Sequence, residues 1–293
     1  MDNLRGIVLI VVAMAAFTIE DMFIKRLSVD MPVGQILIGI GFGSAGVFAV
    51  MARLRGHRIL TRAAWRPVFV VRAICEALAA ISFATALSKV DISIVASVFQ
   101  TTPLAITMGA ALFLGEDVGW RRWTAIIIGF SGVLLIIRPG LDGFEPMALL
   151  VLVSVLMVAT RDILTRRIDI NVPSTVISFQ GFAILVPAGA LLLLLGYGAP
   201  VAPSAPGWAM LGFAVVFGAG AYYCIVTAMR IADASVVTPF RYTRLLFSLL
   251  VGIIIFGERP DALTLTGASL IIATGLYTFL RERRLAREAR LHA

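Results

Sequence analysis

The sequence predicts an all-α membrane protein whose ten transmembrane helices form two inverted five-helix repeats, with both termini in the cytoplasm. Hydrophobic residues make up 60 % of the 293 residues, and charged residues make up only 14 %, whereas about a quarter of a soluble domain is charged. The apolar stretches extend over roughly 20 residues, the length at which an α-helix crosses about 30 Å of hydrocarbon. Alternation with a period of two residues, which marks an outer-membrane barrel, is absent.

Ten apolar segments have the length of membrane-crossing helices. Prolines stand at most of their boundaries, because a residue without an amide hydrogen favours the start or the stop of a helix. The first segment continues directly into Glu20 and Asp21, so we expect a retained helix rather than a cleaved signal peptide. The ten segments are residues 4–25, 32–52, 67–88, 92–114, 121–138, 146–166, 173–196, 207–230, 234–256 and 262–281.

Lysine and arginine are distributed unevenly over the segments that connect these helices. If both termini lie on one side, that side holds 16 of the 25 cationic residues, among them Arg62, Arg121 and Arg167, and the other side holds five. Cytoplasmic loops carry an excess of Lys and Arg, so the count places both termini in the cytoplasm. The basic residues lie in loops and tails rather than on one folded face, and the net charge of +8 therefore predicts no nucleic-acid partner.

Two parts of the sequence match each other without a gap at a shift of 142 residues. Residues 84–116 align with residues 226–258, and the Gly-Glu pair that ends at Glu116 falls on the pair that ends at Glu258. Both pairs close an apolar segment, the fourth in one case and the ninth in the other. The match indicates that the chain contains a duplication.

The duplication extends to the first and sixth segments, where a shift of 141 residues places Glu20 on Arg161. Five helices are an odd number, so the second copy must enter the membrane from the opposite side. Such inverted repeats build many secondary transporters, with the substrate near mid-membrane between the halves. We assign the first repeat, the second repeat and a basic cytoplasmic tail to residues 1–140, 141–281 and 282–293.

Four cations and four acids lie within the predicted helices. An unpaired charge at this depth costs about 3 kcal/mol or more. Equal numbers of the two signs therefore predict mutual pairing around a polar interior, with none of these side chains facing lipid. The eight residues are Arg72, Arg161, Arg241, Arg244, Glu20, Asp21, Glu76 and Asp162.

The chain resembles the EamA-type ten-helix carriers of the drug/metabolite transporter superfamily. The resemblance covers nearly all of residues 5–281 and rests on the paired repeats, on the Gly-Glu pairs at 115–116 and 257–258, and on glycines spaced along the last helix of each repeat. It implies a basket made of the first four helices of each repeat around a central cavity, with the fifth and tenth helices at the periphery.

The same resemblance implies a function and a location. The pattern is most similar to bacterial inner-membrane exporters of neutral and aromatic amino acids that work by alternating access. The number of charges inside the membrane departs from a purely aromatic carrier, so a carrier of S-adenosylmethionine or another charged metabolite is the alternative. The expected partners are the small-molecule substrate and the lipid bilayer.

The ninth segment carries Arg241, Tyr242 and Arg244. The two arginines are three residues apart and share one part of the helix surface, so both guanidinium groups could receive a substrate carboxylate. Pro239 removes a backbone donor just before them and is expected to loosen the helix, as in the broken helices that line transporter sites. In the structural alternative, the arginines neutralise Glu76 and Glu20 of other helices.

The fourth segment is the counterpart of the ninth, and Gln100 falls opposite Tyr242. Ser97 and Gln100 belong to a row of neutral polar residues at helical spacing, which could form a hydrogen-bonding cavity wall or join neighbouring helices. Glu20 is a further candidate and offers a protonatable coupling site. The predicted substrate-binding or gating residues are therefore Arg241, Arg244, Tyr242, Gln100, Ser97 and Glu20.

The other buried charges are expected to form ion pairs that close the cavity. Arg72 and Glu76 are four residues apart on one helix and can pair with each other or with neighbours. Arg161 is expected to form a salt bridge with an acid from the other repeat and so hold one side of the cavity shut. Asp162 and Asp21 complete this set.

The sequence holds no metal-ligand spacing, no Walker loop and no nucleophile elbow. We therefore expect no cofactor, no metal and no enzymatic activity. An intramembrane lipid-modifying enzyme that uses Glu20, Asp21 and Arg241 is the lower-ranked alternative, and the absence of a clustered nucleophile and base speaks against it. The oligomeric state stays open.

Overall fold

A computed structural model describes residues 2–59, 66–115, 119–141, 144–166, 172–232 and 234–291. Every regular element in these ranges is helical, and ten helical segments are long and apolar enough to cross a membrane, which confirms the predicted all-α class and the ten spans. The elements are α1 Asn3–Leu27, α2 Val33–Leu54, α3 Pro67–Leu87, α4 Ile92–Phe99, α5 Thr102–Leu114, α6 Trp120–Ile137, η2 Pro146–Ala148, α7 Leu149–Arg166, α8 Ser174–Ala183, α9 Leu185–Leu194, α10 Ala205–Ile231, α11 Ala234–Val237, η3 Thr238–Tyr242, α12 Thr243–Phe256 and α13 Ala262–Leu291.

The fourth span is interrupted between α4 and α5. Pro103 has no amide hydrogen to offer the carbonyl of Phe99, four residues earlier, and the hydroxyl of Thr102 donates to that carbonyl instead at 2.6 Å. The hydroxyl of Thr101 donates in the same way to the carbonyl of Val98 at 2.6 Å. The sequence had predicted one unbroken helix here.

The ninth span is interrupted at the corresponding depth. It begins as α11, tightens into the 3-10 turn η3 around Pro239, and continues as α12, so the predicted loosening at Pro239 is confirmed. The hydroxyl of Thr243 donates to the carbonyl of Phe240 at 2.6 Å. Thr243 stands 142 residues after Thr101, and both spans thus break at positions that the sequence match aligns.

The seventh span is also divided, at Ile184 between α8 and α9. Pro187 cannot donate to the carbonyl of Ala183, so the helix lacks one backbone hydrogen bond at this point. This break was not predicted, because the proline lies in the middle of an uninterrupted apolar stretch and changes the hydropathy very little.

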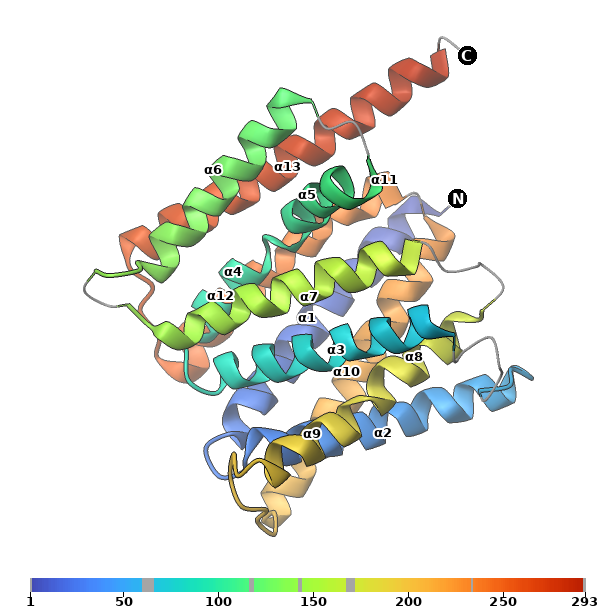
Figure 1. Ribbon diagram of the computed structural model, residues 1–293, viewed down its shortest axis with the longest axis vertical. Helices are drawn as coiled ribbons and strands as arrows, with labels where there is room; N and C mark the ends of the chain where they lie inside the picture. Colours follow the sequence, from blue (N-terminus) through green and yellow to red (C-terminus); the bar gives the residue numbers. More distant parts are fainter. Residues whose placement is uncertain are drawn as a thin grey trace.

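The helices pack into an elongated bundle. Figure 1 shows α6 and α13 side by side at one end of the long axis, and α2 with α8 and α9 at the other. A side chain on Gly132 of α6 would meet the Gly267 carbonyl at 2.7 Å, and one on Gly267 would meet the Gly132 carbonyl at 2.5 Å. Glycine at the crossing therefore lets two backbones touch, and this pair lies at the periphery, where the resemblance placed the fifth and tenth helices.

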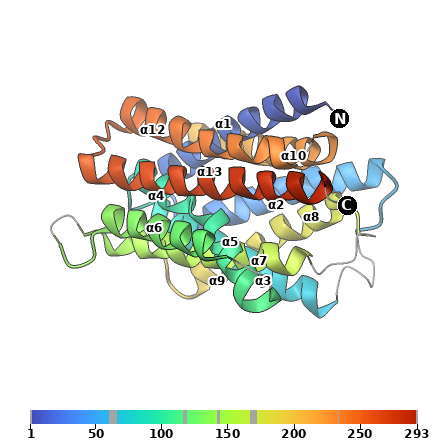
Figure 2. The same cartoon turned by 90° about the horizontal axis from the view of Figure 1, so that it is seen from above.

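The helices run roughly across the long axis, and both termini lie at the same ends of the helices, on the right in Figures 1 and 2. At the opposite end, the largest apolar cluster contains Leu27, Leu87, Ile92 and Ile137, each at most 2 % exposed. That end is therefore closed by tightly packed apolar side chains. We call the two ends the terminal end and the closed end.

The tail departs from its prediction. Helix α13 does not stop near residue 281 but continues to Leu291, so most of the predicted tail is helical. Four residues used in the sequence comparison or the charge count, together with residues 292 and 293, lie outside the described ranges. The four are Arg62, Glu116, Arg167 and Asp233.

An ion pair outside the spans ties α6 to α13 at the closed end. The guanidinium of Arg138 donates to both carboxylate oxygens of Asp261, and the Thr264 amide donates to the same carboxylate at 2.9 Å. The hydrogen bond from Arg138, with that from Thr264, lowers the pKa of Asp261 from 3.8 to about 2. A depressed pKa adds stability above the unfolded value, and this contribution is lost as the pH falls from about 4 towards 2.

We therefore expect Asp261→Asn to lower the free energy of unfolding at neutral pH by at most about 1 kcal/mol, because the carboxylate is 48 % exposed and screened by solvent. The difference from the wild type should shrink below pH 4. Thermal unfolding in detergent at pH 7, 4 and 3 measures this, with the exposed Asp30→Asn as the matched control. An effect of Asp261→Asn that does not change with pH would contradict the ion pair.

Candidate substrate site

Arg241 lies in η3, at the break of the ninth span. Its side chain is exposed, and Asp162 and Arg161 of α7 lie within electrostatic range of it, together with Arg244. Arg241 thus lies beside other charged side chains of the bundle. Among the described residues no carboxylate lies within 4 Å of its guanidinium. The amide Nε2 of Gln100 donates to the Arg241 carbonyl at 3.2 Å, which joins the two broken spans at their breaks.

Arg244 has a different environment, although it is only three residues from Arg241. Its guanidinium donates to the carboxylate of Asp21 on α1 at 2.7 Å, and Asp21 is 3 % exposed. The same guanidinium lies within 5.6 Å of three ring centroids, which belong to Phe17, Phe83 and Phe99. In this structure the charge of Arg244 is thus matched by a carboxylate and by aromatic faces.

A second group of charges joins α3 to α7. Arg161 contacts the Glu76 carboxylate at 2.8 Å and its neighbour Asp162 also at 2.8 Å. Arg72 lies 3.7 Å from the other oxygen of Glu76, and its Nε donates to the hydroxyl of Thr165 at 3.0 Å. The pairing of Arg161 with an acid from residues 1–140 is therefore present, as is the pair within α3.

Glu20 is buried, with 9 % of its surface exposed, and packs against Gly218 of α10. A Cβ on Gly218 would lie 2.3 Å from Oε1 of Glu20, so a larger residue at position 218 would displace the carboxylate from this position. The contact has a counterpart elsewhere in the chain. In the sequence match residue 161 aligns with 20 and residue 76 aligns with 218, so the contacts Arg161–Glu76 and Glu20–Gly218 involve aligned positions.

Two further predicted site residues are enclosed by protein. Ser97 is fully buried, and its hydroxyl donates to the carbonyl of Ser93 at 2.6 Å. Tyr242 is 8 % exposed, its hydroxyl has no partner among the described residues, and its ring packs where Gly275 of α13 leaves space. The structure thus brings Arg241 and Gln100 together, whereas the side chains of Ser97 and Tyr242 lie in the packing around them.

The sequence did not identify the role of Glu258, which follows α12 at the closed end. Its carboxylate is 7 % exposed and accepts hydrogen bonds from the amide of Ile92 at 2.7 Å, the amide of Ser93 at 3.1 Å, and the Ser93 hydroxyl. Lys25 of α1 lies 3.8 Å from the carboxylate and donates to the carbonyl of Val90 at 2.5 Å. We call this set of contacts the Glu258 latch. It ties α12 to the beginning of α4 and to α1.

The Glu258 latch also depends on the small residue Gly252, which leaves room for the carboxylate of Glu258. A Cβ on Gly252 would lie 2.4 Å from the Glu258 carboxylate and 2.6 Å from the Ser93 hydroxyl. The signal in the sequence was the repeated Gly-Glu pair. Gly257 ends α12 at φ 67°, and Gly115 ends α5 at the same angle, which favours glycine because L-residues rarely adopt it.

In the part of the chain that the structure describes, no three His, Cys, Asp or Glu side chains are arranged to hold a metal ion. Cys75 and Cys224 are free thiols. The polar groups described around the broken spans are guanidinium, carboxylate and amide groups, which can bind a polar solute.

Comparisons with known proteins agree with a transporter. The model of the "EamA-like transporter family" matches residues 4–138 and again residues 145–280. A riboflavin transporter of Rhizobium johnstonii is 31 % identical over 251 residues, which cover 84 % of this chain and 81 % of the relative. An S-adenosylmethionine uptake transporter of Rickettsia prowazekii is 24 % identical over 282 residues, with 96 % and 94 % covered.

Two more distant matches have similar coverage. The pseudopaline exporter CntI of Pseudomonas aeruginosa is 23 % identical, with 93 % of this chain and 95 % of the relative covered. The crystal structure of another protein superposes with a TM-score of 0.63 at 18 % identity and covers 94 % of this chain and 98 % of its own, which shows the fold alone. These relatives do not support the expected export of neutral and aromatic amino acids. The family match, made twice along the sequence, shows that this multi-pass membrane protein belongs to the EamA-like transporter family.

Proposed function

We propose that this protein is a secondary carrier of the bacterial inner membrane that moves a zwitterionic heterocyclic metabolite of the S-adenosylmethionine type by alternating access. This proposal replaces the amino-acid exporter with the charged-metabolite alternative. The observation that carries it is Arg241, an exposed guanidinium at a break in a membrane-spanning segment, with no described carboxylate within 4 Å.

An unmatched cation at this depth is costly and is best explained by an anionic partner that is present for part of the transport cycle. S-adenosylmethionine carries a carboxylate for Arg241, and its ammonium and sulfonium groups are cations that an acid can neutralise. Asp162 lies within electrostatic range of Arg241, and Glu20 has no ion pair among the described residues. The site would thus offer groups of both signs to a solute that carries both.

Riboflavin is the second candidate, because relatives named as riboflavin transporters reach 31 % identity. Its flavin ring and hydroxylated chain carry no carboxylate, so it would use the amide of Gln100 and nearby aromatic rings and would not need the charge of Arg241. The two candidates therefore differ in how strongly transport should depend on that arginine.

The packing supports two inverted halves, residues 1–140 and 141–281. Helix α1 packs along α10, and α7 packs along α3. In the sequence match the first span (α1) corresponds to the sixth (α7), and the third (α3) corresponds to the eighth (α10). The pair α1–α10 therefore corresponds to the pair α7–α3. The aligned helix ends at Gly115 and Gly257 and the aligned hydroxyl contacts of Thr101 and Thr243 agree with this. The lysine and arginine count supports a cytoplasmic location of the terminal end.

The test is counterflow in liposomes that contain the purified protein. Vesicles loaded with unlabelled S-adenosylmethionine should accumulate the labelled compound at least tenfold above empty vesicles, and labelled phenylalanine should remain at the background level. Accumulation of riboflavin alone would select the second candidate. Equal leakage of all three compounds would reject both, and repeating the assay with a pH gradient reports on proton coupling.

A further inference from the structure

We infer that the protein holds a binding site for a phosphate group at its terminal end, apart from the substrate site, in a cavity between α2, α8 and α10. The cavity has a volume of about 170 Å³. The amide of Asp2 donates to the carbonyl of Ile231, which lines the cavity, at 3.1 Å. This contact places the cavity beside the amino terminus and thus, by the charge count, on the cytoplasmic side.

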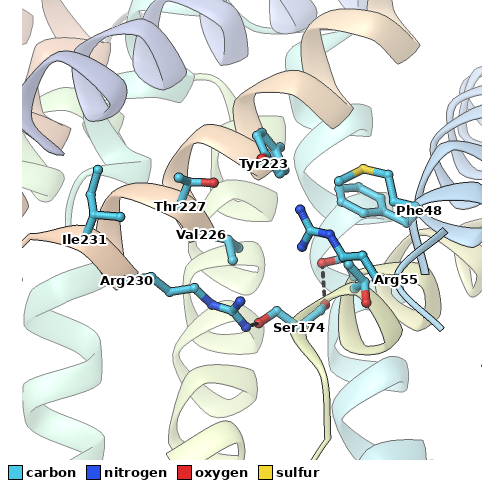
Figure 3. A pocket seen from close by; sticks show the side chains of 11 residues that line it. Phe48, Arg55, Ser174, Tyr223, Val226, Thr227, Arg230 and Ile231 are labelled. Carbon is cyan, nitrogen blue, oxygen red and sulfur yellow. Dashed lines mark hydrogen bonds between the residues drawn. The ribbon is translucent and has the colours of Figure 1, made fainter. Parts of the chain in front are cut away.

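Two guanidinium groups converge on the cavity from different helices. Arg55 enters from the end of α2 and Arg230 from the end of α10, with Ser174 at the start of α8 between them (Figure 3). Arg230 donates to the Ser174 hydroxyl, and the Arg55 guanidinium lies over the Tyr223 ring at 5.9 Å from its centroid. Both arginines are exposed, and no carboxylate of the described residues lies within 4 Å of either. Two cations held this way are arranged for an anion rather than for each other.

The rest of the lining suits an oxyanion. The hydroxyls of Thr175, Ser178 and Thr227 add neutral hydrogen-bonding groups, and Thr175 is already held by Nδ1 of His57 at 2.9 Å. Phe48 also lines the cavity, and its ring stacks on Phe182 at 5.6 Å between centroids. Arginine binds phosphate through two parallel N–H groups, and a phosphate group fits a space of this size.

An anionic phospholipid headgroup is one source of such a phosphate, and a soluble phosphate compound is the other. The outer surfaces of α2 and α10 next to the cavity carry exposed apolar side chains, among them Leu54 at 82 % and Met229 at 44 %. Acyl chains could lie along these surfaces while the headgroup occupies the cavity. Basic pockets between transmembrane helices on the cytoplasmic side are typical sites for anionic lipid headgroups.

The experiment measures thermal unfolding of the full-length protein in a neutral detergent after addition of phosphatidylglycerol, phosphatidylcholine or glycerol 3-phosphate. We expect phosphatidylglycerol to raise the unfolding temperature more than phosphatidylcholine does. The variant Arg55→Gln/Arg230→Gln should lose at least tenfold in apparent affinity for it. Arg53→Gln, which removes an exposed arginine of α2 outside the cavity lining, is the matched control and should behave like the wild type.

An equal effect of glycerol 3-phosphate, lost in the same double variant, would assign the site to a soluble phosphate. The proposal is overturned if Arg53→Gln weakens the response as much as the double variant, or if phosphatidylglycerol and phosphatidylcholine act alike on the wild type. If the double variant does not fold, Arg230→Gln alone replaces it. Counterflow of substrate is measured separately, so failure of this site and failure of the proposed transport function can be told apart.

Discussion

Replacing Arg241 with glutamine is expected to abolish saturable transport of S-adenosylmethionine while leaving the fold intact. Arg241 is exposed at the break of the ninth span and pairs with no described acid, so its removal leaves no buried charge behind. Loss of one partner of a hydrogen-bonded charge pair costs about 2–5 kcal/mol, which corresponds to a loss of affinity of about 30-fold or more. Counterflow with increasing substrate concentration measures this change.

The matched control is Arg244→Gln, three residues further along the same span. Arg244 is the ion-pair partner of Asp21, which is 3 % exposed, so its loss strands a buried carboxylate and should lower the free energy of unfolding by about 3–5 kcal/mol. Arg241→Lys keeps the positive charge but lacks the planar guanidinium group that can bind a carboxylate through two N–H groups. This variant should retain part of the S-adenosylmethionine transport. If Arg241→Gln transports S-adenosylmethionine like the wild type, Arg241 does not bind the substrate carboxylate. If riboflavin transport also depends on Arg241, this residue does not distinguish the two candidate substrates.

Replacing Gly252 with valine is expected to open the closed end of the bundle. The new side chain would occupy the space of the Glu258 carboxylate and the Ser93 hydroxyl, and the latch between α12 and α4 could not form. At the closed end, Ile94 lines a second cavity of about 170 Å³ together with Ser93 of the latch. A cysteine introduced at position 94 should then react at least tenfold faster with a membrane-impermeant maleimide. Glu258→Gln, which removes the charge facing Lys25, should act in the same direction.

Gly212→Val provides the control, because a Cβ on this glycine meets no atom within 4 Å. The labelling experiment requires a background in which Cys75 and Cys224 are replaced, since both are free thiols. If position 94 reacts at the same rate in the Gly252 and Gly212 variants, the Glu258 latch does not control access to this end.

Hydropathy predicted the ten spans because each needs only length and apolar composition, and both are visible in the sequence. The balance of buried charges predicted mutual pairing in the same way, and the pair between Arg161 and Glu76 is present. Which cation pairs with which acid was harder to predict. Arg244 and Asp21 are 223 residues apart, and their contact depends on how α12 packs against α1, which no local pattern encodes.

Other features were missed for related reasons. The break at Ile184 follows from Pro187, which lies in a stretch that is apolar throughout. The sequence predicts Glu258 only as the end of a helix, because its hydrogen-bond donors belong to the start of α4, in the other half of the chain. The amino-acid substrate rested on Gly-Glu helix ends and spaced glycines, which are features of backbone packing and carry little information about the solute.

The contact of Glu20 with Gly218 bears on how the two halves diverged after duplication. Glu20 faces Gly218 in the present chain. Under the proposed repeat, Arg161 is the equivalent of Glu20, and it faces Glu76, the equivalent of Gly218. Two identical first halves assembled antiparallel would set Glu20 against Glu76 twice, and two identical second halves would leave Arg161 facing glycine. Either homodimer would lack the Arg161–Glu76 ion pair, which takes one residue from each half of the present chain.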